Sequence, residues 1–343
     1  MLTERQARIL EFVISEYVEN ASPVASQYIG EKYPVGASSA TIRNEMAELE
    51  EQGYLNQPHT SSGRVPTDRG YRFFVETLMH EEDLSWDAQQ TIRHQFHQVE
   101  HGQAAWTQLA AAVLAQAVHN AALVTEPRAD ACRIKHLQLV SLHDFTALLV
   151  LVLDESRLKQ QMLTLDEICT QDQLTAMANR LNQQFAGFSA AQLVELDPQI
   201  APTERLVMDA VIEIMSSVDG GGFDDAHLEG LRNVVSQPEF SDSEQVLGLL
   251  ELLNESTITR SIPLRSLARG GVTVIIGADN PALPQANEAM RACSVVVASY
   301  GATGDASGAL AVVGPTRMHY SHTISTVRYL AGVMSELLAE HYE

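Results

Sequence analysis

The sequence has few cysteines and no long hydrophobic segment. Cys132, Cys169 and Cys293 are far apart and form no CxxC pair, which excludes a disulfide framework and predicts free, buried thiols in a reducing compartment. The most apolar run, Thr146 to Leu153, is much shorter than a membrane span, and the N-terminus has no apolar stretch typical of a secretion signal. We therefore expect a soluble, cytoplasmic protein with no membrane partner.

Basic residues are also scarce. The chain has 22 Lys and Arg against 44 Asp and Glu, a formal net charge of -22, which disfavours contact with a polyanion such as DNA. The deficit is uneven, because the first 80 residues carry 7 basic and 11 acidic side chains and the rest carry 15 and 33. The acidity therefore belongs mostly to the part of the chain after residue 80.

Motifs for catalysis and cofactor binding are missing. The chain has neither a GxSxG nor an HExxH arrangement, so no nucleophile and base can be paired from sequence. The glycine-rich loops at 219–222 and 301–305 lack the spacing and the following lysine of a phosphate-binding loop. We expect a protein that is not an enzyme and has no cofactor, with these loops as turns.

The first 80 residues have the pattern of a winged helix-turn-helix domain. Apolar periodicity and caps predict helices at 3–19, 22–32 and 38–53, the first opened by a Thr3 and Gln6 capping box and the second by Ser22 and Pro23. Two short strands around a Ser/Gly turn follow between residues 54 and 67. Three helices followed by a hairpin are typical of a DNA-binding winged helix.

The rest of the chain predicts an α+β protein. A polar helix at about 87–101 should link domains, a long helix covers 104–124, and strands are expected at 134–142, 146–153, 158–165, 272–276, 295–300 and 310–313. Helices dominate 171–256, and a helix at 321–340 closes the chain. We expect a winged-helix domain at 1–80, a linker helix at 81–103, one α+β domain at 104–170 and 257–343, and an inserted helical domain at 171–256.

The third helix carries the candidate DNA-reading residues near its amino end. Small polar or hydrogen-bonding side chains gather there, whereas Ile42, Met46 and Leu49 form a core stripe. Arg43 and Asn44 are the best candidates for guanine and adenine edges. The residues predicted to enter the major groove are Ser38, Ser39, Thr41, Arg43 and Asn44. N-capping by either serine, and a helix-internal hydrogen bond of Asn44, are alternatives, as is a winged helix used for protein contacts.

The wing supplies a second set of candidates. Residues 59 to 74 include three arginines and only one aspartate, so this stretch has a local excess of positive charge. The residues predicted to contact phosphates or the minor groove are His59, Thr60, Ser61, Ser62, Arg64 and, after the wing, Arg72. Because one winged helix reads few base pairs, we expect a homodimer on two half-sites. Its interface should lie in 171–256, where five leucines between 247 and 253 exceed one helical stripe; an intramolecular helix pair is the alternative.

Two other kinds of regulator remain possible. His94, His97 and His101 share one helix face and could bind a metal ion, although no cysteine or carboxylate completes the set. A small-molecule sensor in the α+β domain is the other alternative. Loss of DNA binding with a chelator, and its recovery with zinc, would indicate the metal sensor.

Two stretches of sequence resemble a known family. The first runs from Ser39 to Met46 (SATIRNEM) and continues through residues 49–50, 53–55, 57–67 (QPHTSSGRVPT) and 70–72; the second comprises residues 237–240, Ile276 with Gly277, and 314–318 (GPTRM). These motifs resemble the HrcA family of heat-inducible transcription repressors, and the resemblance covers nearly the whole chain. One departure, His319 before Tyr320 where the family commonly has aspartate, leaves the role of residues 314–320 open.

The resemblance implies an architecture and a mode of action. The architecture is a winged-helix domain, a GAF-like domain and an inserted dimerising domain. The action is that of a dimeric repressor of chaperone operons that binds double-stranded DNA at an inverted repeat called CIRCE and releases it on heat stress. The resemblance also implies a partner, the GroEL chaperonin, through which unfolded protein would relieve repression.

Overall fold

The chain folds as two compact units in a computed structural model. The structure describes residues 2–33, 36–59, 62–80, 82–99, 102–129, 131–154, 158–195, 201–220, 226–240, 246–247, 250, 271–277, 292–301 and 306–342. Unit 1 comprises Met1–Arg128 and Phe223–Glu343, and unit 2 is Ala129–Gly222. Within these described ranges, no helix is both long enough and apolar enough to cross a membrane. The three cysteines are buried, as predicted.

Unit 1 begins with three helices around an apolar core. Helix α1 (Glu4–Asn20) starts at the predicted capping box of Thr3 and Gln6. Helix α3 (Ser39–Glu51) is capped by Ser38, and α2 is Ser26–Lys32. The predicted start of the second helix at Ser22 and Pro23 is wrong. Val24 is extended instead, because its backbone N–H and C=O both bond to Arg64 at 2.9 Å and so join the chain before α2 to the wing.

A short hairpin and a fourth helix complete the winged-helix domain. Strands β1 (Leu55–Asn56) and β2 (Val65–Pro66) pair antiparallel, as the predicted wing requires. Helix α4 (Asp68–Phe73) begins at Thr67, whose hydroxyl accepts the Gly70 N–H, and it continues into a π-helical turn, η1 (Phe74–Leu78). Helix α4 follows the wing directly, so the basic residues of α4 lie close to the wing.

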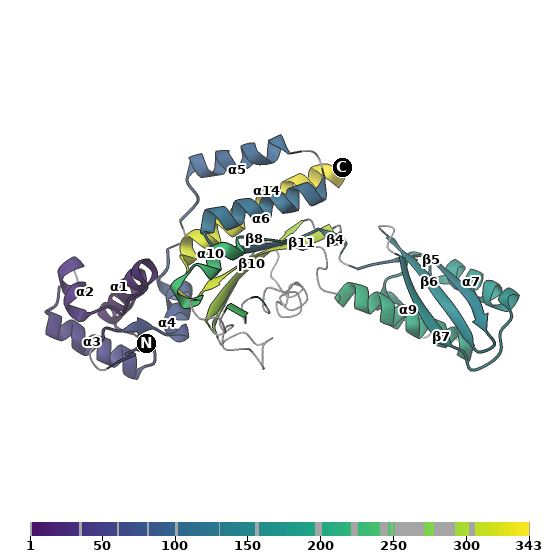
Figure 1. The fold of residues 1–343 in the computed structure, drawn as a ribbon, viewed down its shortest axis with the longest axis horizontal. Helices are drawn as coiled ribbons and strands as arrows, with labels where there is room; N and C mark the ends of the chain where they lie inside the picture. The colour runs from purple at the N-terminus through teal and green to yellow at the C-terminus, as the bar shows by residue number, and fades with distance from the viewer. Residues whose placement is uncertain are drawn as a thin grey trace. The chain divides into compact units, whose positions relative to one another are not determined.

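The GAF-like part of unit 1 is an antiparallel sheet covered on both faces. Its strand order is β8-β3-β11-β10-β9, with β4 (Arg128–Ala129) paired to β11. The strands are β3 (Ala121–Thr125), β8 (Ala226–Glu229), β9 (Val272–Ile276), β10 (Cys293–Gly301) and β11 (Ala306–Pro315). Helices α6 (Gln103–Val118) and α14 (Tyr320–Tyr342) cover one face (Figure 1). Val234 of α10 (Leu231–Val235) and Phe240 of η3 (Pro238–Phe240) pack on the other.

Two predictions for this part need correction. The long helix expected at 104–124 ends at Val118, because His119 adopts a left-handed conformation (φ 52°) and the next residues form the buried strand β3. The polar helix α5 (Trp86–Gln98) does more than link domains. Its Ile92 and Phe96 are buried, and its Arg93 bonds to Tyr329 (3.1 Å) and Glu336 (3.2 Å) of α14. Helix α5 is therefore part of the folded core.

Unit 2 is an α/β insertion with its own core. Strands β5 (Ile134–His143), β6 (Thr146–Leu153) and β7 (Leu158–Thr164) form a three-stranded antiparallel sheet. One face packs against α7 (Gln171–Phe185), α8 (Ala190–Glu195) and α9 (Pro202–Gly220). The insertion therefore spans 129–222 instead of 171–256, and it is not purely helical. The three strands pair with one another and share a hydrophobic core with these helices, which assigns them to the insertion.

Candidate nucleic-acid interface

Helix α3 is fixed in the domain by its apolar stripe. Ile42, Met46 and Leu49 are fully buried, as predicted, and Ile29 of α2 is buried with them in the same core. The two helices approach closely at Gly30, where an added Cβ would lie 3.3 Å from Cδ1 of Ile42. The opposite face of α3 is consequently held towards solvent.

The amino-terminal half of α3 presents three of the predicted reading residues. Ser39, Arg43 and Asn44 are exposed, and no residue that the structure describes pairs with Arg43 or Asn44 through a hydrogen bond or ion pair. Ser38 is the N-cap, since its Oγ accepts the Thr41 N–H at 3.2 Å and lies 3.0 Å from the Thr41 hydroxyl. Ser38 and Thr41 therefore shape the helix end, whereas Arg43 and Asn44 are available to a partner.

Three of the four carboxylates in the second half of α3 are bonded inside the domain. Glu45 pairs with Arg5 (3.4 Å), Glu48 accepts from Gln6 (2.8 Å) and Glu50 pairs with Arg64 (3.0 Å). Glu45 and Glu48 are thus bonded to α1, and Glu50 is bonded to the wing. The sequence analysis missed these partners because they lie far from α3 along the chain.

The wing is braced against the same helix. The Gln57 N–H donates to Glu50 at 3.1 Å, and the Gln57 side-chain amide donates to the Ser62 carbonyl at 2.8 Å. Ser62 closes the turn by donating to the His59 carbonyl at 2.7 Å. His59 is exposed and Ser62 half-buried; the predicted contacts Thr60 and Ser61 lie outside the described residues. These bonds fix the wing against Glu50 in the last turn of α3.

Arg64 occupies a different place from the one its predicted role requires. Its side chain is only 12% exposed, and its guanidinium is bonded to Glu50. In the protein without DNA, the Arg64 side chain therefore supports the wing through its bond to Glu50.

We expect Arg64→Ala to destabilise the winged-helix domain by about 1–2 kcal/mol, because Glu50 loses its charged partner in a partly desolvated site. Denaturant unfolding of Arg64→Ala, Glu50→Gln and the double variant measures this. The double variant should cost less than the two single changes together, and strictly additive losses would show that the pair is not coupled.

The basic residues around the wing differ in their surroundings. Arg72 of α4 is exposed. Arg69, which the sequence analysis did not select, lies over the Tyr54 ring at 4.6 Å and donates to the Gln52 carbonyl at 2.8 Å. Lys32 of α2 bonds to Glu16, and this hydrogen bond raises the pKa of Lys32 above its ordinary value. Counting charges along the sequence could not separate these cases, because the partners are set by the fold.

The structure describes some of the residues on which the two alternative sensors depend. His94 and His97 are exposed on α5, with His94 bonded to Gln98 at 2.9 Å, and His101 lies outside the described residues. No group of three or more potential metal ligands occurs among the residues that the structure describes. Of the two glycine-rich loops, positions 221–222 and 302–305 lie outside the described residues, so the structure places no ligand site there.

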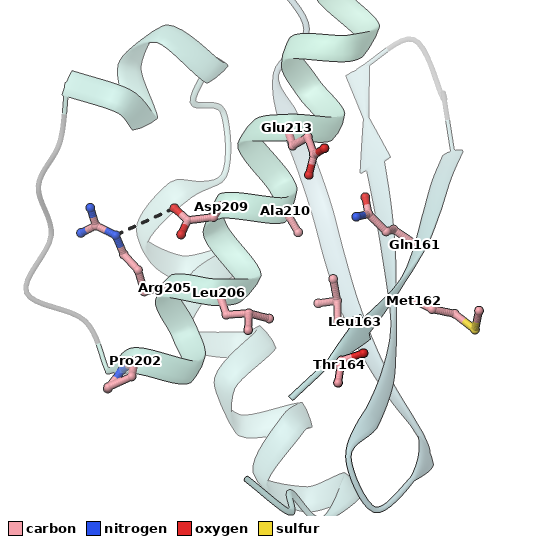
Figure 2. A pocket seen from close by; sticks show the side chains of 10 residues that line it. All are labelled: Gln161, Met162, Leu163, Thr164, Pro202, Arg205, Leu206, Asp209, Ala210 and Glu213. Carbon is pink, nitrogen blue, oxygen red and sulfur yellow. Dashed lines mark ion pairs between the residues drawn. The ribbon is translucent and has the colours of Figure 1, made fainter. Parts of the chain in front are cut away.

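A groove of about 500 Å³ lies elsewhere, between β7 and α9 of unit 2 (Figure 2). Leu163 points towards α9, whereas Met162 points away from it to the other side of the sheet. The rim carries an ion pair between Arg205 and Asp209 at 3.9 Å, both largely exposed. The groove thus offers an apolar floor and a solvated rim, without a buried polar group that would orient a ligand.

Comparison with known proteins agrees with this architecture. The family model described as "HrcA protein C terminal domain" matches residues 105–324. The chain is 44% identical to the heat-inducible transcription repressor HrcA of Roseiflexus castenholzii and 42% identical to that of Herpetosiphon aurantiacus, in each case over 99% of this chain and 96% of the relative. The repressor of the same name from Dehalococcoides mccartyi is 38% identical over 100% of this chain and 97% of its own.

A solved structure shares the fold. A crystal structure described as that of a hypothetical protein, 22% identical, matches 99% of this chain and 98% of its own with a TM-score of 0.57. Sequence identity at this level supports the fold alone, whereas the curated relatives support the family. With a family model over more than half of its length and relatives matched from end to end, the chain belongs to the HrcA family of heat-inducible transcription repressors.

Proposed function

We propose that the protein represses chaperone operons by binding the inverted-repeat CIRCE operator as a homodimer and releasing it on heat stress. The observation that carries this proposal is the exposed end of α3, where Arg43 and Asn44 have no partner among the described residues while the carboxylates farther along the helix are bonded within the domain. Helix-turn-helix proteins read bases from the amino-terminal end of the motif's second helix, which corresponds to α3 in this domain. The net charge of -22 therefore opposes docking less at this surface than it would if these carboxylates were all free.

Each of the predicted DNA-binding residues has a proposed role. Arg43 would bond guanine O6 and N7, and Asn44 adenine N6 and N7. Ser39, His59, Ser62 and Arg72 would contact the DNA backbone, and Thr60 and Ser61 are proposed to do so on the strength of their sequence position alone. Ser38, Thr41 and Arg64 are proposed to act first by holding the helix end and the wing in place.

The dimer is proposed to form through the uncovered face of the unit 2 sheet. On this open face, defined by Leu148, Val150, Val152, Leu158 and Met162, β6 and β7 bring their side chains together in the pairs Leu148–Met162 and Val152–Leu158. Leu158 is 60% and Met162 70% exposed. Such an apolar surface is typical of an interface, and an inverted repeat calls for a two-fold dimer, in which one patch meets its own copy.

This proposal moves the interface from the helices expected at 171–256. The apolar stripes of α7 and α9 are already buried against the sheet of their own unit, so they cannot also serve a second subunit. Of the five leucines between 247 and 253, only Leu247 and Leu250 lie among the described residues, and both are exposed. The open face is therefore the stronger candidate.

Family membership supports three further proposals. We propose that GroEL restores the active conformation and that its capture by unfolded protein relieves repression. We also propose that the protein acts in the cytoplasm, where its operator lies, and that it has no catalytic activity.

Gel-shift titration with a CIRCE duplex tests the function. We expect tight binding that weakens steeply with salt, since each neutralised phosphate contributes about -0.9 to the slope of log K against log salt. Binding should weaken on heating and be strengthened by GroEL. A scrambled duplex of equal length is the control, and equal affinity for both duplexes at every salt concentration and temperature would refute sequence-specific repression.

A further inference from the structure

Arg317 joins the winged-helix domain to the GAF-like part of unit 1. Its guanidinium forms an ion pair with Glu239 and donates to the Gln237 side chain (3.2 Å), both in the core, and it also donates to the Val18 carbonyl of α1 (3.2 Å). The side chain is only 15% exposed. A single planar donor thus spans two parts of the fold that are 299 residues apart in the sequence.

The Val18 carbonyl lies in the last turn of α1, where a positive charge is favoured. Carbonyl groups at a helix C-terminus lack partners within the helix and carry the negative end of its dipole. Helix α1 has no basic residue of its own in that turn. Arg317 supplies the missing charge from the core, which gives the docking contact both direction and strength.

Other contacts line the same junction. The rings of Tyr71 in α4 and Tyr320 in α14 lie 5.9 Å apart, and both side chains are buried. Gly277 of the core lies so close to Asp68 that an added Cβ would be 2.3 Å from the carboxylate. Ser321 donates to the His80 carbonyl at 2.9 Å. The contacts come from α1, α4 and the segment after them, so the exposed end of α3 stays free while the domain is docked.

The junction also contains an energetic weakness. The Tyr71 hydroxyl and Oε2 of Glu239 are buried and have no hydrogen-bond partner among the residues that the structure describes. A buried polar group without a partner costs free energy, because it has lost water without replacement. These two groups offset part of the stability that the apolar contacts of the junction supply, and Arg317 provides polar bonds across the same junction.

We propose that Arg317 is a positioning residue for operator binding, which fixes the winged helix on the core and thereby sets the separation of the two recognition helices in the dimer. This inference rests on the proposed function. Two half-sites on one duplex lie at a fixed spacing. Once one winged helix of the dimer has bound, the second meets its half-site at a higher effective concentration if both are held rigidly at that spacing than if they are loosely attached. Loss of Arg317 should therefore affect paired half-sites and spare single ones.

The test compares full-length wild type with Arg317→Ala and Arg317→Lys on three duplexes. One carries the CIRCE repeat, one a single half-site, and one the repeat with about 5 bp added between half-sites, which is half a helical turn. Arg317→Ala should lose at least about 10-fold in affinity for the normal repeat, change less than about twofold on the half-site, and discriminate less against the lengthened spacer. Arg317→Lys should be intermediate, since an ammonium cannot reproduce the planar fork of donors.

Arg93→Ala is the matched control, because Arg93 forms an arginine–glutamate pair between α5 and α14 that does not touch the winged helix. It should behave as wild type. The inference is overturned if Arg317→Ala keeps wild-type affinity and spacer preference, or if it loses half-site binding to the same degree, which would indicate unfolding of the winged helix. A wild type that binds none of the three duplexes would instead overturn the proposed function.

Discussion

Arg43→Ala is expected to weaken binding to the operator by about 1–3 kcal/mol per half-site, a factor of about 5 to 150, and to relax the preference at one base position. Arg43 is exposed on the amino-terminal half of α3, and no residue that the structure describes pairs with it. Its removal should therefore cost little stability and act mainly on the complex. Titration against the operator and against a set of single-base variants measures both effects.

Arg8→Ala provides the control for this change. Arg8 is exposed on α1 and pairs with Glu4 at 2.9 Å, one helical turn away on the same helix. Like Arg43→Ala, the Arg8→Ala substitution removes one positive charge from the winged-helix domain, but at a position with no proposed DNA contact. Equal losses in the two variants would mean that only net charge matters, and an unchanged base preference in Arg43→Ala would remove Arg43 from the reading residues.

Val150→Glu is expected to convert the dimer into monomers and to reduce affinity for the inverted repeat towards that for one half-site. Val150 lies at the centre of the open face, between Gln138 of β5 and Gln160 of β7. A glutamate there would place two like charges at a two-fold contact and bury them without partners. Analytical ultracentrifugation over a concentration series gives the dimer dissociation constant, and gel shift gives the loss of operator affinity.

The matched control is Gln183→Glu on α7. This position is exposed in the same unit and gains the same negative charge away from the open face. Circular dichroism should show that both variants remain folded. A Val150→Glu protein that sediments as a dimer would remove the open face as the interface.

Local signals in the sequence predicted the winged helix well. The Thr3 capping box, the Ser38 cap and the α3 stripe all act within a few residues of one another, and the structure has them where they were expected. The start of α2 was misplaced because Val24 bonds to Arg64, forty residues away. Chemistry within one helical turn can be read from sequence, whereas competition from a distant backbone group cannot.

The strands show the same limit in the rest of the fold. Most strand segments were found from their β-branched and leucine content, yet β5, β6 and β7 were assigned to the wrong sheet. Alternation of apolar residues tells that a strand has a buried face, but it carries no information on which strands pair. Pairing is decided by the turn lengths and by the helices that share the core, here α7 and α9.

The sequence by itself determined the family and the winged-helix outline, and it proposed Ser39, Arg43 and Asn44 as reading residues, because each of these depends on contiguous motifs or helix periodicity. Only the tertiary structure decided that the carboxylates of α3 are bonded within the domain, that Arg64 supports the wing, and that Arg317 ties α1 to the core. These outcomes depend on ion pairs and hydrogen bonds between residues up to 299 positions apart, and such bonds form only when the folded chain brings the two groups within bonding distance.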